Sequence, residues 1–192
     1  MIRLKLCLQN CLRLEDYPRP HILKRVRHLS YLRDCYGAFD KFKSLSGLEY
    51  LRALIPEAIQ GNMKDKKHLE ELSLSWSGIN ADDSQIEREN LDKLKPDKNI
   101  KKLEINGYRG TKFPDWFGDH SFCNLVSLNL RKCRDCDSLP AVGQLPSLKH
   151  LSISGMHRIL QLTREFYWNV SSVPPFRALA NLVFKQMPEL IE

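Results

Sequence analysis

The sequence predicts an α/β solenoid, with about seven short parallel strands in a curved sheet on its concave side and loops and a short helix on its convex side. The first observation is an apolar triplet of the form L-x-x-L-x-L that recurs seven times along the 192 residues. The second is its spacing, because successive triplets begin 22, 21, 31, 25, 23 and 31 residues apart. Four of these spacings lie within the roughly 20–29 residues typical of leucine-rich repeats. The chain is therefore expected to form a leucine-rich repeat solenoid.

Each triplet predicts one strand, because its second and third apolar side chains stand two positions apart and so point to the same side. Strands stacked side by side join their apolar sides into one core, which a single repeat cannot bury alone. The seven triplets are Val26/Leu29/Tyr31, Leu48/Leu51/Ala53, Leu69/Leu72/Leu74, Ile100/Leu103/Ile105, Leu125/Leu128/Leu130, Leu148/Leu151/Ile153 and Leu179/Leu182/Phe184.

The segments between triplets are expected to return across the outer side as one helix and several short turns. Ser84 and Glu87 form an S-x-x-E capping box, which predicts a helix through Leu91 that ends at Pro96 and explains one of the long spacings. The other long spacing indicates an insertion over residues 161–175. Proline marks the turns expected elsewhere, at Phe113–Pro114, Leu139–Pro140 and Gln144–Leu148.

The domain organisation predicted from the sequence is simple. Residues 26–192 form the repeat domain, and residues 1–25 form a basic N-terminal segment that is an incomplete remnant or a cap. No apolar run approaches the roughly 18 residues of a membrane-spanning helix. The N-terminal stretch MIRLKLCLQNC offers no small-residue cleavage site of a secretory signal, so a cytoplasmic protein is expected.

The formal net charge of +7 arises in the first third of the chain, because residues 1–67 carry 14 Lys and Arg against 7 Asp and Glu. The remaining residues carry 16 of each kind. A basic segment from Arg3 to Lys67 could contact nucleic acid or an acidic protein surface. No recognition helix, zinc-finger spacing or aromatic RNA-binding motif accompanies it, so nucleic acid is a minor alternative.

The sequence contains none of the common catalytic motifs, such as phosphate-binding loops, nucleophile elbows or H-E-x-x-H helices. The chain is therefore not expected to be an enzyme, and no catalytic residue, metal ligand, cofactor or small-molecule substrate is predicted. Cys133 and Cys136 form one C-x-x-C pair, but a structural zinc site needs four ligands and no second pair follows. Cys133 also occupies a slot that favours Asn or Cys in these repeats, so a packing role is expected.

The candidate site is the polar side of the predicted strands, since side chains between and beside the apolar ones point away from the core. Large repeat surfaces of this kind bind other macromolecules, and a protein partner is expected here. The candidate protein-binding residues are Tyr50, Arg52, Glu71, Ser73, Lys102, Glu104, Asn106, Asn129, Arg131, His150, Ser152, Asn181 and Lys185.

Four motifs are similar to those of one protein family. They are L-x-P-x-x-N-I-x-x-L at residues 94–103, G-Y-x-G-x-x-F-P-x-W at 107–116, N-L-V-S-L-x-L-x-x-C at 124–133 and L-P-x-x-G-Q-L-P-S-L-K-H-L at 139–151. Through these motifs the chain resembles the leucine-rich repeat region of plant coiled-coil nucleotide-binding disease-resistance proteins, which are intracellular immune receptors. The stretches RHLSYLRD around Leu29 and VFKQMPEL around Met187 extend the likeness to most of the chain.

The resemblance implies a recognition and regulatory module, which binds a pathogen effector or host partner and helps to restrain a nucleotide-binding switch domain. The 192 residues include no phosphate loop of such a switch, so the chain looks like a fragment or a truncated paralogue. A substrate-binding scaffold of a ubiquitin-ligase adaptor is the alternative, because it would use the same kind of surface.

Overall fold

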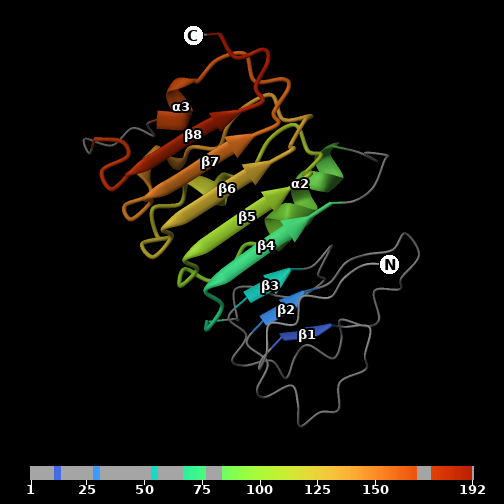
Figure 1. The fold of residues 1–192 in the computed structure, drawn as a ribbon, viewed down its shortest axis with the longest axis vertical. Helices are drawn as coiled ribbons and strands as arrows, with labels where there is room; N and C mark the ends of the chain where they lie inside the picture. The colour runs from blue at the N-terminus through green and yellow to red at the C-terminus, as the bar shows by residue number, and fades with distance from the viewer. Residues whose placement is uncertain are drawn as a thin grey trace.

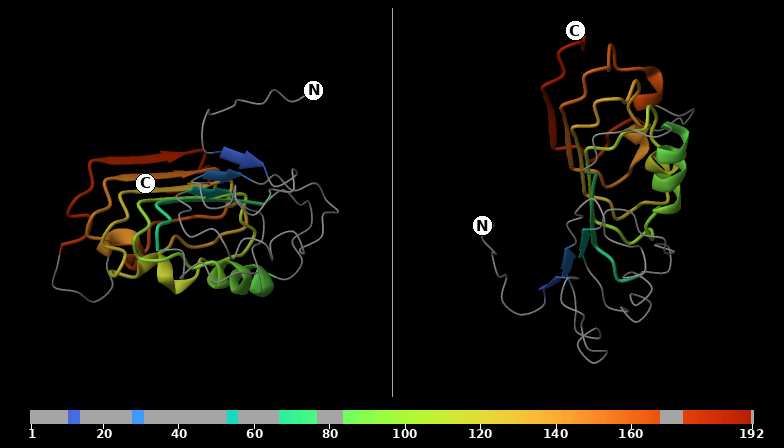
Figure 2. Two further views of the ribbon diagram at one scale, coloured as in Figure 1. Left: turned by 90° about the horizontal axis from the view of Figure 1, so that it is seen from below. Right: turned by 90° about the vertical axis from the view of Figure 1, so that its right-hand side faces the viewer.

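Within the described residues, eight parallel strands form one sheet, in which the spatial order of the strands follows the chain (Figure 1). The computed structural model describes residues 11–13, 28–30, 53–55, 67–76, 84–167 and 174–191. The helices lie on one side of the sheet, as the two views of Figure 2 show. The strands are β1 (Cys11–Arg13), β2 (His28–Ser30), β3 (Ala53–Ile55), β4 (Glu71–Ser75), β5 (Lys102–Asn106), β6 (Ser127–Arg131), β7 (His150–Ser154) and β8 (Asn181–Lys185).

The α/β solenoid prediction is confirmed, with one strand more than the seven expected. The additional strand is β1, which lies within the segment predicted to precede the repeats and pairs in parallel with β2. Leu12 stands opposite Leu29 in this pairing and so continues the leucine row of the other strands. The sequence pattern missed β1 because no second leucine-type residue stands at the expected distance before Leu12.

The strand register differs from the prediction at β3. The structure places Leu54 opposite both Leu29 and Leu72, whereas the predicted triplet put Leu51 in that row. Leu48, Leu51 and Leu54 follow one another at intervals of three, so the L-x-x-L spacing fits this segment in two ways. Ile55 follows Leu54 directly, and a β-branched residue favours the later placement of the strand.

Two rows of apolar side chains run across β4–β7 and form the centre of the core. Their side chains alternate with polar ones along every strand, and each is at most 2% exposed. Burial of one such side chain contributes about 1.5–3 kcal/mol to folding. The rows are Leu72, Leu103, Leu128 and Leu151, then Leu74, Ile105, Leu130 and Ile153.

The predicted helix is present as α2 (Ser84–Lys93), which covers the back of the sheet near β4 and β5. Leu91 is buried in the core, and the helix ends before Pro96, which cannot continue it. The hydroxyl of Ser84 accepts a hydrogen bond from the backbone N–H of Thr111 (2.9 Å) and so ties the first turn to a neighbouring coil. Within the described residues, no helix is both long and apolar enough to pass through a membrane.

In the described part of the chain, short turns form the returns between β5 and β6 and between β6 and β7, as the prolines predicted. The first, η3 (Asp115–Gly118), follows Pro114, and the second, η4 (Val142–Gln144), follows Pro140. Aromatic rings fill the space behind β5 and β6, where Trp116 stacks on Phe117 with ring centroids 4.1 Å apart. The insertion before β8 contains the short helix α3 (Arg164–Tyr167), whose Phe166 is fully buried.

The residue that follows each of β5–β8 has a left-handed backbone conformation. Gly107 and Gly155 have φ angles of 74° and 69°, and the equivalent Lys132 and Gln186 both have 53°. The turn lets the backbone ladder extend one residue beyond the strands, because the N–H of Lys132 donates to the carbonyl of Ser154 (2.8 Å). Two coils thus place a bulkier residue where glycine fits without strain.

Candidate functional site

The candidate site is the side of the sheet that the helices do not cover, which we call the open face. It is made by the outward-pointing side chains of β4–β8, and parallel pairing arranges these side chains in three rows. The first row is Glu71, Lys102, Ser127, His150 and Asn181; the middle row is Ser73, Glu104, Asn129, Ser152 and Val183; the last row is Ser75, Asn106, Arg131, Ser154 and Lys185.

The structure brings eleven of the thirteen candidate residues together on this face. None of the eleven is buried, whereas the leucine-type residues between them are buried in β4–β7. The other two candidates, Tyr50 and Arg52, lie outside the described residues. The alternation of polar and apolar positions was therefore sufficient to place the side chains, and their role in binding stays a prediction.

Four members of the face were not predicted, although they obey the same alternation. Ser127 comes directly before Leu128, and Ser75 and Ser154 come directly after the last buried residue of β4 and β7. The fourth, Val183, lies between the two apolar residues of β8. A count of every second residue along each strand would have found all four.

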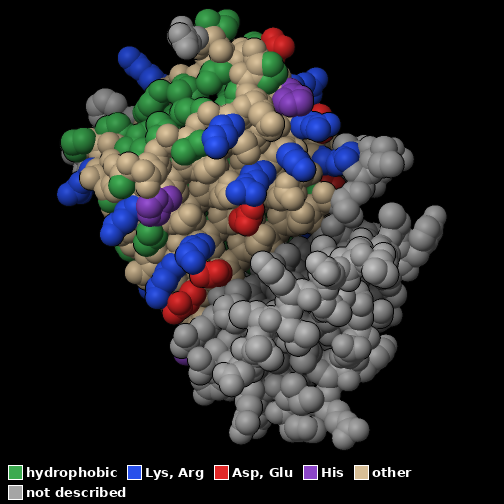
Figure 3. All heavy atoms as spheres, in the orientation of Figure 1, with side chains coloured by type: hydrophobic (Ala, Val, Ile, Leu, Met, Phe, Trp, Pro, Cys, Tyr) green, Lys and Arg blue, Asp and Glu red, His purple; other side chains and the backbone are tan. Residues whose placement is uncertain are grey.

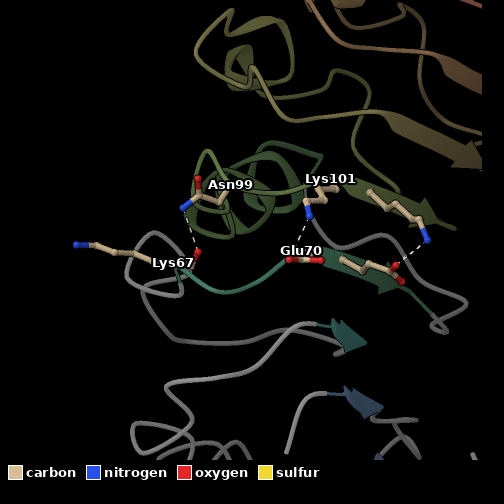
Figure 4. A network of polar contacts seen from close by, with 6 residues as sticks. Lys67, Glu70, Asn99 and Lys101 are labelled. Carbon is tan, nitrogen blue, oxygen red and sulfur yellow. Dashed lines mark hydrogen bonds and ion pairs between the residues drawn. The ribbon is translucent and has the colours of Figure 1, made fainter.

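Charged side chains pair across β4 and β5 at the first row. Lys102 Nζ lies 2.6 Å from Glu71 Oε1, and just before the strands Lys101 Nζ lies 3.2 Å from Glu70 Oε1. Figure 4 shows the second pair beside Asn99, whose amide donates to the backbone carbonyl of Lys67. These exposed pairs contribute little to stability, on the order of 0–1 kcal/mol each. They leave this part of the open face close to charge balance.

Contacts are sparser over β6–β8. Arg131 Nε donates to Asn129 Oδ1 (3.1 Å) and lies 3.7 Å from Glu104 Oε1 on β5. In the first row, Asn181 Nδ2 lies 2.9 Å from His150 Nδ1. The sequences of β6, β7 and β8 contain no Asp or Glu. The open face therefore changes from mixed charge at β4 and β5 to basic and neutral polar groups at β6–β8.

The C-x-x-C pair packs inside the solenoid. Cys133 and Cys136 are fully buried, and their thiols donate to the backbone carbonyls of Arg131 (3.3 Å) and Gly110 (3.1 Å). A hydrogen bond with Cys133, together with burial, raises the pKa of the Cys136 thiol far above its ordinary range. Thiolates are the nucleophilic form, so this environment disfavours nucleophilic attack by Cys136. In the described ranges, His, Cys, Asp and Glu form no group of three that could hold a metal ion.

The open face offers many hydrogen-bond donors and acceptors. Its histidine, His150, contacts the amide of Asn181. The geometry suits reversible contact with another polar surface.

Comparison with known proteins agrees with this geometry. A family model described as R13L1/DRL21 leucine-rich repeats matches residues 39–156. The chain is 36% identical to the putative disease resistance RPP13-like protein 1 of Arabidopsis thaliana over 179 residues, which are 86% of this chain and 16% of the relative. It is 39% identical to the putative disease resistance protein RGA1 of Solanum bulbocastanum over 99 residues, which are 50% of this chain and 10% of the relative.

The first match covers most of the present chain and the second covers half of it, whereas each spans less than a fifth of the relative. The segment matched by the family model includes β3–β7, and so it contains the core rows and all of the open face except its β8 positions. Together with the eight-stranded parallel sheet, the matches show that the chain belongs to the R13L1/DRL21 leucine-rich repeat family, the repeat region of plant disease-resistance proteins.

Proposed function

We propose that this chain is the protein-recognition and regulatory module of a plant innate immune receptor. The open face binds a pathogen effector or a host partner, and it restrains a nucleotide-binding switch domain when no effector is present. We place this activity in the cytoplasm and assign it to the repeat domain over residues 26–192, with the basic N-terminal segment of residues 1–25 as a cap or remnant.

One observation carries the proposal: three rows of polar side chains cross the open face in register, directly above the buried apolar rows of the core. The sheet fixes the positions of these side chains before any partner arrives, which reduces the entropy lost on binding. Leucine-rich repeat domains are generally protein-interaction modules, and the relatives are named as disease-resistance proteins. These observations support a role of the open face in protein binding.

The middle row gives the sharpest test, because Asn129 and Ser152 lie next to each other at its centre. In the double variant Asn129→Arg/Ser152→Arg, two large side chains obstruct the face and leave the core untouched. We expect this variant to lose co-precipitation with the nucleotide-binding region of a full-length family member expressed as a separate polypeptide. A receptor that carries the same two substitutions should trigger leaf cell death without an effector, because the restraint is lost.

The matched control is Lys98→Glu, in the loop between α2 and β5, where the side chain is exposed and lies off the open face. This variant should co-precipitate as the wild type does. Thermal unfolding of all three proteins establishes that they are folded. Equal co-precipitation of the obstructed variant and the wild type would contradict a role of the open face in restraint.

A further inference from the structure

The last row of the open face carries a group of cations at β6–β8. Parallel pairing aligns Arg131, Ser154 and Lys185 on three successive strands. Neighbouring strands lie about 4.8 Å apart, so the backbones of Arg131 and Lys185 are on the order of 10 Å apart with a serine between them. Lys132 follows Arg131 directly and lies against Gly155, because a Cβ on that glycine would stand 3.6 Å from Lys132 Cγ. Cationic residues thus stand on the two strands that flank Ser154, Arg131 and Lys132 on one side and Lys185 on the other.

These cations have little to neutralise them. Among the residues that the structure describes, neither Lys132 nor Lys185 forms an ion pair, and both side chains are exposed. Arg131 reaches one carboxylate, that of Glu104, only at 3.7 Å. Figure 3 shows Lys and Arg side chains over this part of the face. The group is therefore available to an anionic partner, in contrast to Lys101 and Lys102, which pair with Glu70 and Glu71.

The backbone at Lys132 is a further observation beside the charge, and Gln186 has the same φ angle at the equivalent position after β8. The φ angle of 53° at Lys132 is one that costs a residue with a Cβ about 1–2 kcal/mol, and two of the four equivalent positions hold glycine. The lysine side chain makes no ion pair with a described residue that would compensate for this strain. Strained residues are enriched at binding sites, where the side chain is needed for contact with a ligand.

We propose that Arg131, Lys132 and Lys185 bind an acidic segment of a partner protein, with Ser154 as an additional hydrogen-bond donor. This inference rests on the proposed function and specifies the partner's chemistry. In an extended segment, acidic residues two positions apart point the same way and are about 7 Å apart. Long Lys and Arg side chains span such a distance from their positions on β6 and β8. The arginine can bind a carboxylate through two parallel hydrogen bonds.

A carboxylate-bearing protein segment fits this surface better than a nucleic acid. The carboxylate of Glu104 lies beside Arg131 and would repel a continuous phosphate backbone that follows the row. The described part of the open face also presents no Phe, Tyr or Trp side chain on which bases could stack. Discrete carboxylates can approach Lys132 and Lys185 and avoid Glu104.

The experiment measures fluorescence anisotropy of a short labelled peptide in which glutamate alternates with serine. Its matched control is the peptide with glutamine in place of glutamate. We expect the chain to bind the acidic peptide and to bind the neutral peptide at least about tenfold more weakly, with added salt weakening the acidic complex. The double variant Lys132→Glu/Lys185→Glu should bind the acidic peptide at least about tenfold more weakly than the wild type.

Two further variants separate this site from general charge effects. Lys98→Glu/Lys112→Glu changes the charge equally at exposed positions off the open face and should change the affinity less than about twofold. Lys132→Gly removes one cation and relieves the strained backbone, so it should weaken peptide binding without loss of thermal stability. A merely structural role of Lys132 would not produce that combination.

Three results would overturn the inference: equal affinity for the acidic and neutral peptides, equal loss in the two charge-reversed variants, or tighter binding of a short single-stranded DNA than of the acidic peptide. None of them would affect the proposed function, which is tested separately by Asn129→Arg/Ser152→Arg and the switch region. If those two substitutions leave restraint intact while the acidic peptide still depends on Lys132 and Lys185, the proposed function fails and the acidic site remains.

Discussion

At Lys132 the backbone conformation and the surface charge favour different residues. The left-handed turn after β6 is required because the N–H of Lys132 continues the backbone ladder to β7. Glycine would adopt this turn without steric strain, as Gly155 does at the equivalent place one coil later. Lysine at position 132 therefore adds a positive charge to the surface and also adds steric strain to the backbone.

The substitution Lys132→Gly should raise the free energy of unfolding by about 0.5–1 kcal/mol. Relief of the left-handed conformation contributes about 1–2 kcal/mol, and the greater freedom of glycine in the unfolded chain removes part of that gain. Urea denaturation followed by circular dichroism measures the difference. The opposite change, Gly155→Ala, should destabilise the protein, because its φ is 69° and the new Cβ would stand 3.3 Å from Lys132 Cα. A loss of stability in Lys132→Gly would contradict this account.

A second prediction at the residue scale concerns the loss of stability at low pH through the carboxyl of Asp119, which lies behind the sheet. Hydrogen bonds from Lys95 Nζ (2.8 Å) and from the backbone N–H of Ser121 (2.9 Å) hold the pKa of the Asp119 carboxyl well below its ordinary value. A carboxyl with a lowered pKa stabilises the fold above its unfolded pKa, about 4, and that contribution disappears as the pH falls through the folded pKa.

Asp119→Asn should therefore reduce the free energy of unfolding by about 1 kcal/mol at neutral pH, since the pair is partly exposed. The difference from the wild type should shrink below about pH 4, where the wild-type carboxyl also loses its advantage. Thermal melts over a pH series would measure this, with Asp115→Asn as the control because the Asp115 carboxylate is almost fully exposed. If the stability difference between Asp119→Asn and the wild type stays constant down to strongly acidic pH, the Lys95–Asp119 pair is not its cause.

At the scale of single strands, the position of a strand in the sheet determines how much a leucine contributes to the free energy of unfolding. Leu128 on β6 is 1% exposed because β5 and β7 flank it, whereas Leu182 occupies the same row on β8 and is 45% exposed. Among the described strands, β8 pairs only with β7. The same residue type in the same register thus has two different surroundings.

Leu128→Ala should lower the free energy of unfolding by about 2–5 kcal/mol, because it leaves a cavity between packed coils. Leu182→Ala should lower it by less than about 1 kcal/mol, since much of that side chain already contacts water. Chemical denaturation of the two variants, with Ser127→Ala as a surface control, provides the comparison. Equal losses in the two leucine variants would place Leu128 outside the core and overturn the register of β6.

The strands could be predicted where their apolar pattern has one possible placement, as at Leu103, Leu128 and Leu151. Prediction was wrong at Leu51, because leucines at equal intervals of three allow two registers and the pairing of β3 with β2 and β4 decides between them. The open face was largely predictable for the same reason as the core, because alternate residues of a strand point to opposite sides of the sheet. The unusual turn at Lys132 was not predictable from this chain alone, because lysine carries no signal for a left-handed backbone. Its unpaired charge also depends on which neighbours the coils bring close.

For the whole molecule, coils that contact only their neighbours should differ in local stability. The central strands β5–β7 each pair on both sides, and β8 has one described partner. We expect backbone amides of β6 to exchange with solvent deuterium at least about tenfold more slowly than those of β8, because local opening at the end of a stack breaks fewer contacts. Hydrogen exchange with peptide mass spectrometry measures both strands in one experiment. Uniform protection of β6 and β8 would indicate that the described coils unfold as a single unit.

The strict alternation along β4–β7 has a consequence for how such a molecule can change over generations. Because one set of positions maintains the hydrophobic interior and the other makes only polar contacts at the surface, such as Glu71–Lys102, mutation can change the exposed set with little penalty to folding. In a plant population that faces a changing pathogen, the exposed residues can thus be substituted while the core residues stay the same. Serine, asparagine and histidine at neighbouring sites of this sheet are the kinds of residues that such turnover can exchange freely.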